Sequence, residues 1–207
     1  MKLYRHPERL AYTGEQLHPH FALERFGVAG DAVVCFRGPC SVKEDRLVDL
    51  EDRRAGAAIE AAEMLHFIVE HFGITLESIV LRQRLLVALA AELLAEFLAR
   101  RRPGISPGDV RRRGDDIFVL GKKATVSIAS VSPVSGMIHL GINIDPAGAP
   151  VAAWGLQHEG IDPDEFAAAL GEAYLDEIEG VAHASSKVRP LQPAAGSRPR
   201  MSPPHAG

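Results

Sequence analysis

Cysteine is scarce in this sequence: 207 residues contain only Cys35 and Cys40. Two thiols are too few for a disulfide-stapled scaffold, so we expect a protein of a reducing compartment, the cytoplasm. Long apolar runs are also missing, because none approaches the roughly 18 residues that cross a bilayer. The first residues, Met-Lys-Leu-Tyr-Arg-His-Pro, lack the apolar stretch of a signal peptide. We therefore expect neither a membrane protein nor a secreted one.

Excess positive charge is absent as well. Lys and Arg total 23 against 27 Asp and Glu, which gives a net charge of −4. Domains that grip nucleic acid by its phosphates usually have a pI above about 9, whereas the pI here is near 6.1. Nucleic acid is therefore not the expected partner. Hydrophobic residues make up 46% of the chain, enough for a sizeable core, which excludes disorder of the whole chain.

The first half of the chain predicts short strands followed by two helices. Residues 31–36 form a β-prone run that ends at Arg37-Gly38-Pro39, and residues 41–50 are a weaker strand candidate. From 55 to 73, apolar residues recur at three- and four-residue spacing and Gly73 follows, which predicts a helix with its C-terminal glycine. Residues 76–98 are rich in helix formers and predict a second helix.

The second half predicts a strand meander and one more helix. A loop is predicted at 105–114. Three strand candidates follow it, at 117–120, 125–131 and 137–144, and turns at 121–122 and 133–136 would join them. Asp162 resembles an N-cap with Pro163 in the first turn, so a helix should run to Ile178.

Strands and helices are segregated along the chain rather than alternating. This order predicts an α+β fold with a mainly antiparallel sheet flanked by helices. We expect one domain over residues 1–185. Residues 186–207 are rich in proline and poor in bulky apolar residues, which predicts a disordered tail.

Alternation in the meander separates polar from apolar side chains. In the last strand candidate Ile138, Leu140, Ile142 and Ile144 would form one face, with Met137, His139, Gly141, Asn143 and Asp145 on the other. In the preceding strand Val126 and Ile128 would point into a core, opposite Lys123, Thr125 and Ser127. An antiparallel pair would gather Lys123, Thr125, Ser127, His139 and Asn143 on one face. That face is either a site, with Gly141 leaving room beside the backbone, or an ordinary solvent-facing surface.

The sequence of these strands resembles that of the central catalytic strands of biotin protein ligases, lipoate ligases and octanoyltransferases. Val119-Leu-Gly-Lys-Lys-Ala124 matches a strand and turn of the form Gly-Arg/Lys-Lys, and Lys123 stands at the position of that superfamily's invariant lysine. His139-Leu-Gly-Ile-Asn-Ile144 matches the following strand, Gly-Ile-Gly-Ile-Asn-Val, with His139 in place of the first glycine. The match covers roughly thirty residues.

A longer resemblance extends almost to Ser185. The sequence resembles the family called domain of unknown function 366 in four segments. These segments are Cys35-Phe-Arg-Gly-Pro39, Val48-Asp-Leu-Glu-Asp52, Met64-Leu-His-Phe-Ile-Val-Glu-His-Phe72 and Val80-Leu-Arg-Gln-Arg-Leu-Leu-Val87. That resemblance implies the fold of class II aminoacyl-tRNA synthetases and biotin synthetases. It implies no activity, because none is established for the family.

The ligase resemblance assigns roles to individual residues. Lys123 would stabilise negative charge on an acyl carbonyl and α-phosphate, and Asn143 would orient the acid or hold the turn. His139 would serve as general base. The remaining expected binding residues are Arg37, Gly38, Arg82, Arg84, Thr125, Ser127 and Gly141, with Arg37 and Arg82 neutralising phosphate.

The departures from that pattern also matter. The Arg- and Gly-rich adenylate loops of both ligase types are missing, and Arg37-Gly38-Pro39 is the nearest counterpart. No cysteine follows Asn143, so the octanoyltransferase nucleophile has no equivalent.

Three further groups have two readings each. Arg82 and Arg84 would bracket a phosphate or carboxylate, or one of them would be exposed and the other would pair with Asp49 or Glu51. Asp49 and Glu51 lie on a strand face and bind a ligand, or are acids at a solvated edge or a helix N-terminus. The arginines at 100–102 and 111–113 are solvated, or contact an acidic carrier or tRNA. No metal site is expected, because His66 and His71 would point apart on the predicted helix.

Two function hypotheses result. The first is an enzyme that binds a small carboxylic acid or nucleotide and activates or transfers the acyl group, with ATP and Mg²⁺ as the implied cofactors. An acyl-carrier protein and a second copy of the chain are the implied partners. The alternative is a non-catalytic ligand-binding or regulatory module that kept the pocket and lost the chemistry.

Overall fold

The computed structural model describes residues 1–189, which form two β-sheets and four α-helices. The strands are β1 (Lys2–Arg9), β2 (Ala32–Val42), β3 (Ile59–Phe72), β4 (Val110–Arg113), β5 (Asp116–Val119), β6 (Lys122–Lys123), β7 (Thr125–Val131) and β8 (Ser135–Asp145). The helices are α1 (Phe21–Phe26), α2 (Leu50–Arg54), α3 (Leu76–Arg101) and α4 (Pro163–Lys187). Short 3-10 turns lie at Glu44–Arg46, Pro107–Asp109 and Leu156–Glu159.

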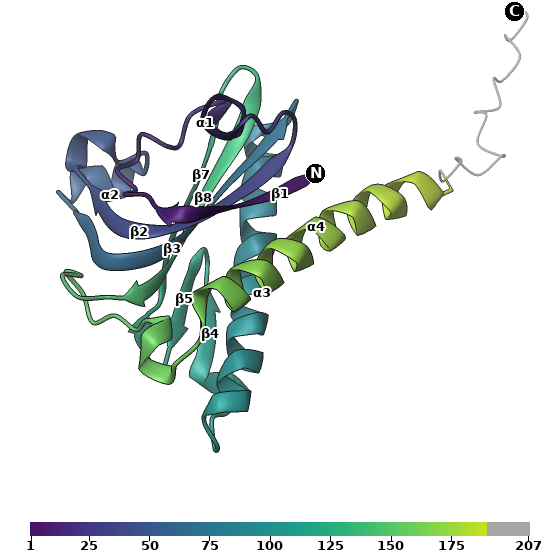
Figure 1. Ribbon diagram of the computed structural model, residues 1–207. Helices are drawn as coiled ribbons and strands as arrows, with labels where there is room; N and C mark the ends of the chain where they lie inside the picture. Colours follow the sequence, from purple (N-terminus) through teal and green to yellow (C-terminus); the bar gives the residue numbers. More distant parts are fainter. Residues whose placement is uncertain (190–207) are drawn as a thin grey trace, which may run out of the picture.

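The main sheet has five strands in the order β1-β2-β3-β8-β7. Only the edge pair β1–β2 is parallel, while the other neighbours are antiparallel. The long helices α3 and α4 pack on one face of the sheet, and α1 and α2 lie toward the other (Figure 1). The predicted α+β class, with a mainly antiparallel sheet flanked by helices, is confirmed.

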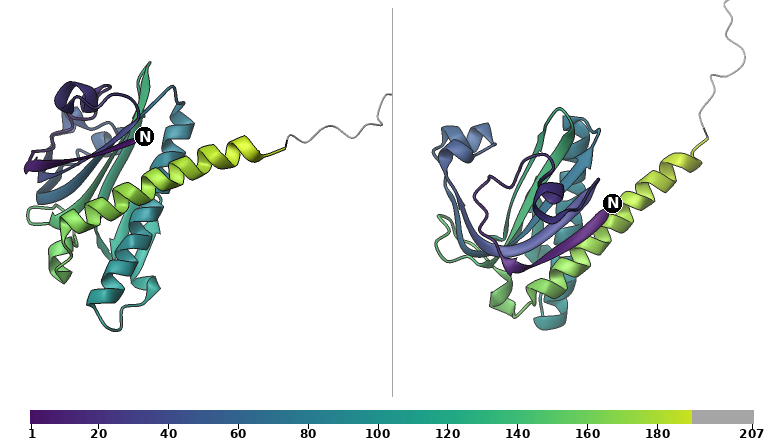
Figure 2. Two further views of the ribbon diagram at one scale, coloured as in Figure 1. Left: turned by 45° about the vertical axis from the view of Figure 1, so that its right-hand side comes forward. Right: turned by 45° about the horizontal axis from the view of Figure 1, so that its top comes forward.

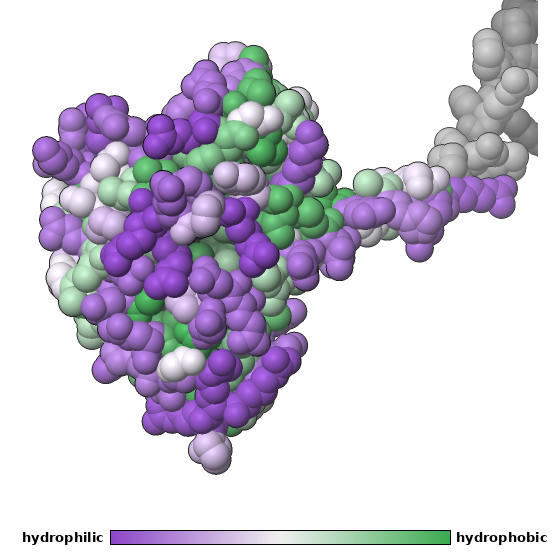
Figure 3. Space-filling model, viewed as in Figure 1, coloured by the Kyte–Doolittle hydropathy of each residue, from purple (hydrophilic) through white to green (hydrophobic). Residues whose placement is uncertain are grey.

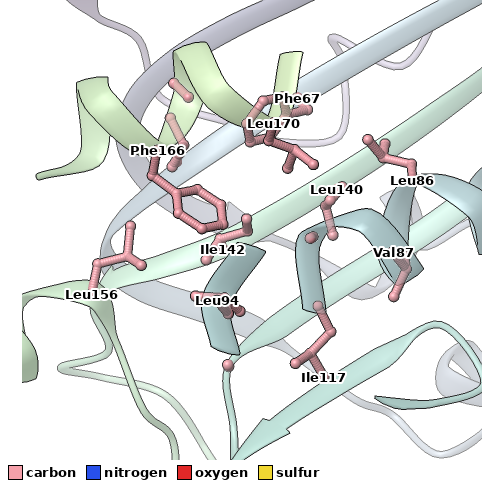
Figure 4. Packing of buried hydrophobic residues seen from close by; sticks show 14 of the residues in the cluster. Phe67, Leu86, Val87, Leu94, Ile117, Leu140, Ile142, Leu156, Phe166 and Leu170 are labelled. Atoms are coloured by element: carbon pink, nitrogen blue, oxygen red, sulfur yellow. The ribbon is translucent and has the colours of Figure 1, made fainter. Parts of the chain in front are cut away.

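Apolar side chains fill both faces of this sheet. On one face, strand residues such as Phe67, Leu140 and Ile142 meet Leu94 of α3 and Phe166 of α4 (Figure 4). On the other face a second cluster gathers around the N-terminal segments and includes Tyr12, Phe36, Met64, Ile68 and Met137. The central strands are therefore covered on both sides.

This double burial explains the largest error of the sequence analysis. The segment predicted as a helix over 55–73 is the central strand β3. From Met64 to His71 every residue is buried. A strand buried on both faces reads as a continuous apolar run rather than an alternating one, and periodicity cannot distinguish such a run from a buried helix.

The two long helices were predicted, although α4 is longer than expected. Thr75 caps α3 by accepting a hydrogen bond from Ser78 N at 3.2 Å. Asp162 caps α4, accepting from the backbone amides of Asp164 and Glu165. The helix α4 passes the predicted end at Ile178, reaches Lys187 and projects from the body of the protein (Figure 2). The tail predicted at 186–207 therefore begins inside the helix, and residues 190–207 lie outside the described part of the chain.

The surface around α4 is mixed. In the space-filling view the visible face is mainly hydrophilic, and hydrophobic residues gather where α4 leaves the body (Figure 3). Within residues 1–189, no helix is both long and apolar enough to cross a membrane.

A second sheet, β4-β5-β6, lies beside the main one. Strand β4 occupies part of the predicted loop 105–114. The β5–β6 hairpin pairs Val119 with Lys122, so its two turn residues are Leu120 and Gly121 rather than the predicted 121–122. Both have positive φ, 51° and 78°. A two-residue turn of this kind requires positive φ at both positions, and Gly121 adopts it without steric cost.

Candidate functional site

A cleft of about 760 Å³ opens on the face of the main sheet that carries the Tyr12 cluster. Its apolar lining comes from Tyr12, Val42, Leu47, Val48, Ala57, Ala58, Ile59, Met64, Val126, Ile128 and Val151. Its polar lining includes Arg46, Asp49, Glu51, Asp52, Glu60, Asp115, Asp116, Lys123, His139 and Asn143. Volumes of this size are typical of small-molecule sites. We take this cleft as the candidate site.

Lys123 enters the cleft from the β5–β6 hairpin. Its Nζ lies 2.9 Å from Asp116 Oδ2, and about a third of each side chain is exposed. Burial raises the pKa of Asp116 above its usual range, although the hydrogen bond from Lys123 opposes this rise. Because Asp116 is partly desolvated, the carboxylate of a ligand could replace it as the partner of Lys123.

Asn143 holds the backbone on which Lys123 stands. Its Nδ2 donates to the carbonyl oxygens of Lys123 and Trp154 at 3.3 and 3.2 Å. Lys123 N also donates to Ala152 O, and Trp154 N donates to Lys123 O. The Asn143 amide is therefore engaged in fixing the hairpin, which was one of its two expected roles.

His139 lies on the floor of the cleft in a stack of aromatic rings. The Tyr12 ring lies over it with 3.7 Å between centroids and 14° between planes. His139 Nε2 is 3.1 Å from Nδ1 of His66, a residue of β3. Burial, and secondarily the neighbouring His66, lower the pKa of His139 well below its usual value. The imidazole is therefore neutral at pH 7 and a weak general base.

Thr125 and Ser127 border the cleft, but the prediction that they share a face with His139 is wrong. In the β7–β8 register Ser127 stands opposite Leu140, and His139 stands opposite Ile128. Directly opposed residues share a face, so both hydroxyls belong to the side of α3. Thr125 Oγ1 accepts from Ile117 N, and Ser127 Oγ accepts from Gln83 Nε2 while donating to His139 O.

The same register corrects the orientation predicted for Val126 and Ile128. These two side chains point to the His139 face, where they line the cleft. The prediction extended one alternation through Lys123 and Thr125, but these residues belong to strands of different sheets.

The two expected glycines accommodate protein atoms. At Gly141 a Cβ would come within 2.8 Å of Met64 Cε, so the space beside its backbone is already filled. At Gly38 a Cβ would overlap the carbonyl of Leu10, which packs against β2. The carbonyl oxygen of Gly38 faces His66 Nε2 at 3.2 Å.

The three expected arginines lie outside the lining of the cleft. Arg37 forms ion pairs with Glu63 at 3.1 Å and Asp164 at 3.6 Å. Arg84 pairs with Asp115 at 3.0 Å, not with the predicted Asp49 or Glu51.

Arg82 lies against His71, a residue that also contacts Asp31 and Tyr174. This group sits away from the cleft lining, so the structure does not bring Arg82 and Arg84 together with Lys123.

The remaining charged motifs have mostly structural partners. Asp49 is the N-cap of α2 and accepts from Glu51 N at 2.7 Å, so the helix-terminus reading of these acids is confirmed. The arginines at 100–102 pair with Glu96, Glu165 and Glu159. Among the arginines at 111–113, Arg111 and Arg112 donate to the carbonyls of Gly108 and Gly114, and Arg113 lies over the Phe118 ring.

Electrostatically, the cleft is acidic. Six carboxylates line it, from Asp49, Glu51, Asp52, Glu60, Asp115 and Asp116, against the two cations Arg46 and Lys123. Arg46 is itself paired with Glu15 at 3.1 Å. No group of three or more His, Cys, Asp or Glu converges as metal ligands in residues 1–189. Both cations of this lining already pair with carboxylates, so the described lining offers no unpaired cation to the phosphates of a nucleoside triphosphate and does not fit that group.

Sequence reasoning missed three residues of the site. Tyr12 and His66 form the floor with His139, and Asp116 is the partner of Lys123. From the sequence, His66 was considered only as a possible metal ligand. Because residues 55–73 were wrongly predicted as a helix, His66 could not be placed beside His139. Tyr12 lies far from the recognised motifs, and only the isolated bridge between Tyr12 and Cys40 places it over the sheet.

Comparisons with known proteins identify relatives over nearly the whole chain. Residues 1–189 match the family described as "Domain of unknown function (DUF366)". The uncharacterized protein MJ0805 of Methanocaldococcus jannaschii is 35% identical over 191 residues, 89% of this chain and 82% of that protein. A solved protein of unknown function from Pyrococcus horikoshi is 40% identical with a TM-score of 0.84, covering 93% of this chain and all of the other.

More distant structures share the fold. A variant of the biotin protein ligase of Aquifex aeolicus in complex with biotin has a TM-score of 0.55 at 13% identity, covering 88% of this chain and 72% of the ligase. The Aquifex enzyme with biotin and ATP gives 0.52 at 12% identity, covering 88% and 71%. Protein Ta0514 of T. acidophilum, assigned as a lipoate protein ligase, gives 0.54 at 14% identity and covers 86% of each chain. The chain therefore belongs to the DUF366 family and shares the fold of biotin and lipoate protein ligases.

Proposed function

We propose that the cleft binds a small carboxylic acid, or the acyl group derived from one, with Lys123 as the partner of the carboxyl oxygens. The protein then activates or transfers that acyl group, as its ligase-like fold suggests. The observation that carries this proposal is the Lys123–Asp116 pair at 2.9 Å in a cleft that is also lined by apolar side chains such as Met64, Val126 and Ile128. An acid with an apolar body would satisfy both features at once.

Lys123 would act by charge. When the acyl carbonyl is attacked, negative charge develops on its oxygen, and a preorganised ammonium group stabilises that charge most strongly in a site shielded from water. Asn143 supports this role because it fixes the Lys123 backbone. An acyl-carrier protein as donor of the acyl group remains a prediction of the same proposal.

A non-catalytic module is the second candidate, and the charge of the cleft favours it. Arg37, Arg82 and Arg84 lie away from the lining, and the lining carries six carboxylates. We therefore derive no step through ATP. A module that only holds the acid would need Lys123 and the apolar walls but no further cation.

Calorimetric titration with biotin and octanoic acid tests acid binding. We expect at least one acid to bind the wild-type protein, and Lys123→Met to weaken that binding roughly tenfold or more, because a hydrogen bond to a charged group contributes about 1.5–3 kcal/mol. Lys122→Met is the matched control, since Lys122 is the exposed neighbour on the same strand. Equal affinities for the two variants would contradict the assignment to Lys123.

Thermal shift measurements test whether the protein is an adenylate-forming enzyme. The unfolding temperature is followed with the acid alone, with ATP and Mg²⁺ alone, and with all three together, because ligands that bind the folded state raise it. Synergy, with release of pyrophosphate, would identify an adenylate-forming enzyme. Stabilisation by the acid alone favours the binding module or an enzyme that receives its acyl group already activated.

A further inference from the structure

The polar floor of the cleft is a pair of histidines beneath a tyrosine. Tyr12, His66 and His139 are each at most 3% exposed. Tyr12 stacks on His139 at 3.7 Å and on His66 at 5.2 Å between ring centroids. Tyr12 and His139 line the cleft, whereas His66 lies behind them and is fully buried.

The hydrogen bonds of this group fix where each proton lies. A backbone carbonyl only accepts, so His66 Nε2 carries a proton and donates it to Gly38 O at 3.2 Å. In a neutral imidazole the other nitrogen is then bare, and His66 Nδ1 must accept. It accepts from His139 Nε2 at 3.1 Å, which leaves Nδ1 of His139 as the bare nitrogen.

The rings of His66 and His139 are both neutral, as this arrangement of hydrogen bonds requires. Burial lowers the pKa of His66 to about 3, and the hydrogen bond to Gly38 opposes that shift only in part. The pKa of His139 is also lowered, first by burial. At neutral pH the floor therefore presents an acceptor and not a charge.

No described residue donates to this acceptor. Four buried side-chain atoms of the described chain lack a hydrogen-bond partner: His6 Nδ1, Thr13 Oγ1, Arg37 Nε and Trp154 Nε1. His139 Nδ1 is not one of them, although it has no protein partner, so it retains access to the cleft that the residue lines. A bare imidazole nitrogen that reaches the cleft accepts a hydrogen bond from the donor that occupies the cleft, which is either water or a ligand.

The acceptor and the lysine are anchored at different positions along the cleft. His139 and Asn143 are four residues apart on β8, and Asn143 contacts the Lys123 backbone. At about 3.3 Å per strand residue, the Cα atoms of His139 and Asn143 are roughly 13 Å apart along β8. An extended acid of about eight carbons, together with a hydrogen bond at each end, spans such a distance.

We infer that the cleft selects acids that carry a neutral hydrogen-bond donor, an N–H or O–H group, at the end remote from the carboxyl. His139 is the specificity-determining acceptor, and His66 is a positioning residue that fixes its tautomer. This inference rests on the proposed function, because it takes the carboxyl end to lie at Lys123. It excludes unsubstituted fatty acids and ether-capped acids as preferred ligands, since neither donates to the floor.

Three acids with the same eight-carbon chain test the selection: octanoic acid, 8-hydroxyoctanoic acid and 8-methoxyoctanoic acid. Only the hydroxy acid donates at its far end. Calorimetry should show that the wild-type protein binds it about three- to tenfold more tightly than the other two, the factor expected for one net hydrogen bond. His139→Leu should abolish the difference while the binding of octanoic acid stays the same or strengthens.

The positioning role of His66 has its own readout. Nitrogen-15 NMR of the histidine rings distinguishes a protonated from a bare nitrogen, and in the ligand-free wild-type protein His139 should show Nε2–H and bare Nδ1. His66→Gln keeps an amide oxygen that can accept from His139 Nε2, so this variant should retain the preference for the hydroxy acid. His66→Leu removes the acceptor and should reduce both the tautomer bias and the preference.

The outcomes separate this inference from the proposed function. If none of the three acids binds, the proposed function fails and the inference falls with it. If the acids bind through Lys123 but with equal affinities, or if His139 carries its proton on Nδ1, the inference is overturned while the proposed function stands. A preference for the hydroxy acid that survives His139→Leu also overturns it.

Discussion

At the scale of single residues, three buried histidines set how this protein responds to acid. His66, His71 and His139 are at most 3% exposed, and each has a lowered pKa. Burial is the main cause in all three, and for His71, whose pKa falls to about 4, the Arg82 charge adds to it against the hydrogen bond to Asp31. In the unfolded chain the same histidines titrate near pH 6.5. The unfolded state therefore binds protons at a higher pH than the folded state does.

The sign of the pH dependence follows. Above about pH 6.5 both states are neutral at these sites, and stability does not depend on them. As the pH falls from about 6.5 toward 4, the unfolded state gains protons and the free energy of unfolding decreases by up to about 1.4 kcal/mol per pH unit for each histidine. Urea denaturation at pH 7, 6 and 5 measures this slope.

His139→Gln should make the slope shallower by up to about 1.4 kcal/mol per pH unit, because one titrating group is removed. The glutamine amide can still donate to His66 Nδ1. His183→Gln, on the exposed side of α4, is the control and should leave the slope unchanged. Identical slopes for wild type and His139→Gln would contradict a neutral buried His139.

At the scale of elements, close backbone packing decides where glycine is required. Gly38 lies in β2 beside a register irregularity, and Leu10 passes so close that a Cβ would overlap its carbonyl oxygen. Gly180 lies on α4 with nothing within 4 Å of the position of a Cβ. The same substitution should therefore have opposite effects in the two elements.

Gly38→Ala should lower the free energy of unfolding by about 1–3 kcal/mol, because overpacking forces the backbone to shift. Gly180→Ala should raise it by about 0.5–1 kcal/mol, since alanine costs less entropy than glycine within a helix. Chemical denaturation measures both. A neutral Gly38→Ala would show that Leu10 can move away from β2.

At the scale of the whole molecule, a buried hydrogen-bonded chain ties α4 to the sheet. His71 of β3 contacts Asp31 Oδ2 through Nδ1 at 3.0 Å and Tyr174 Oη through Nε2 at 2.9 Å. Asp31 Oδ1 also accepts from Phe72 N at 2.9 Å. Residues from three distant parts of the sequence thus meet at one point.

Tyr174→Phe should lower the free energy of unfolding by about 1–3 kcal/mol, because it leaves the buried Nε2 of His71 without a partner. Amide hydrogen exchange along α4 should also become faster. Tyr4→Phe is the matched control, because Tyr4 packs on Phe26 through its ring, and we expect a change within about 0.5 kcal/mol. Equal effects of the two variants would show that the hydroxyl of Tyr174 does not anchor the helix.

Local signals determined much of this protein from the sequence alone. The helix at α3, the Asp162 cap of α4, the β7–β8 hairpin and the position of Lys123 on a hairpin depend on capping, turn residues and short-range periodicity, which are properties of neighbouring residues. The predicted three-strand meander was wrong in its first strand, because β5 pairs with β4 and β6 in the second sheet. The α+β class and the family followed from the order of elements and from shared phrases.

Tertiary structure alone decided the rest, because it depends on what covers each face and on register. The strand β3 looked like a helix since it is buried on both sides, and the hydroxyls of Thr125 and Ser127 turned away from His139 since side chains alternate with a period of two. The meeting of Tyr12, His66 and His139 is likewise a product of strand pairing across distant segments. The sequence was therefore sufficient to predict Lys123 as a site residue, whereas the cluster of Tyr12, His66 and His139 could be identified only from the tertiary structure.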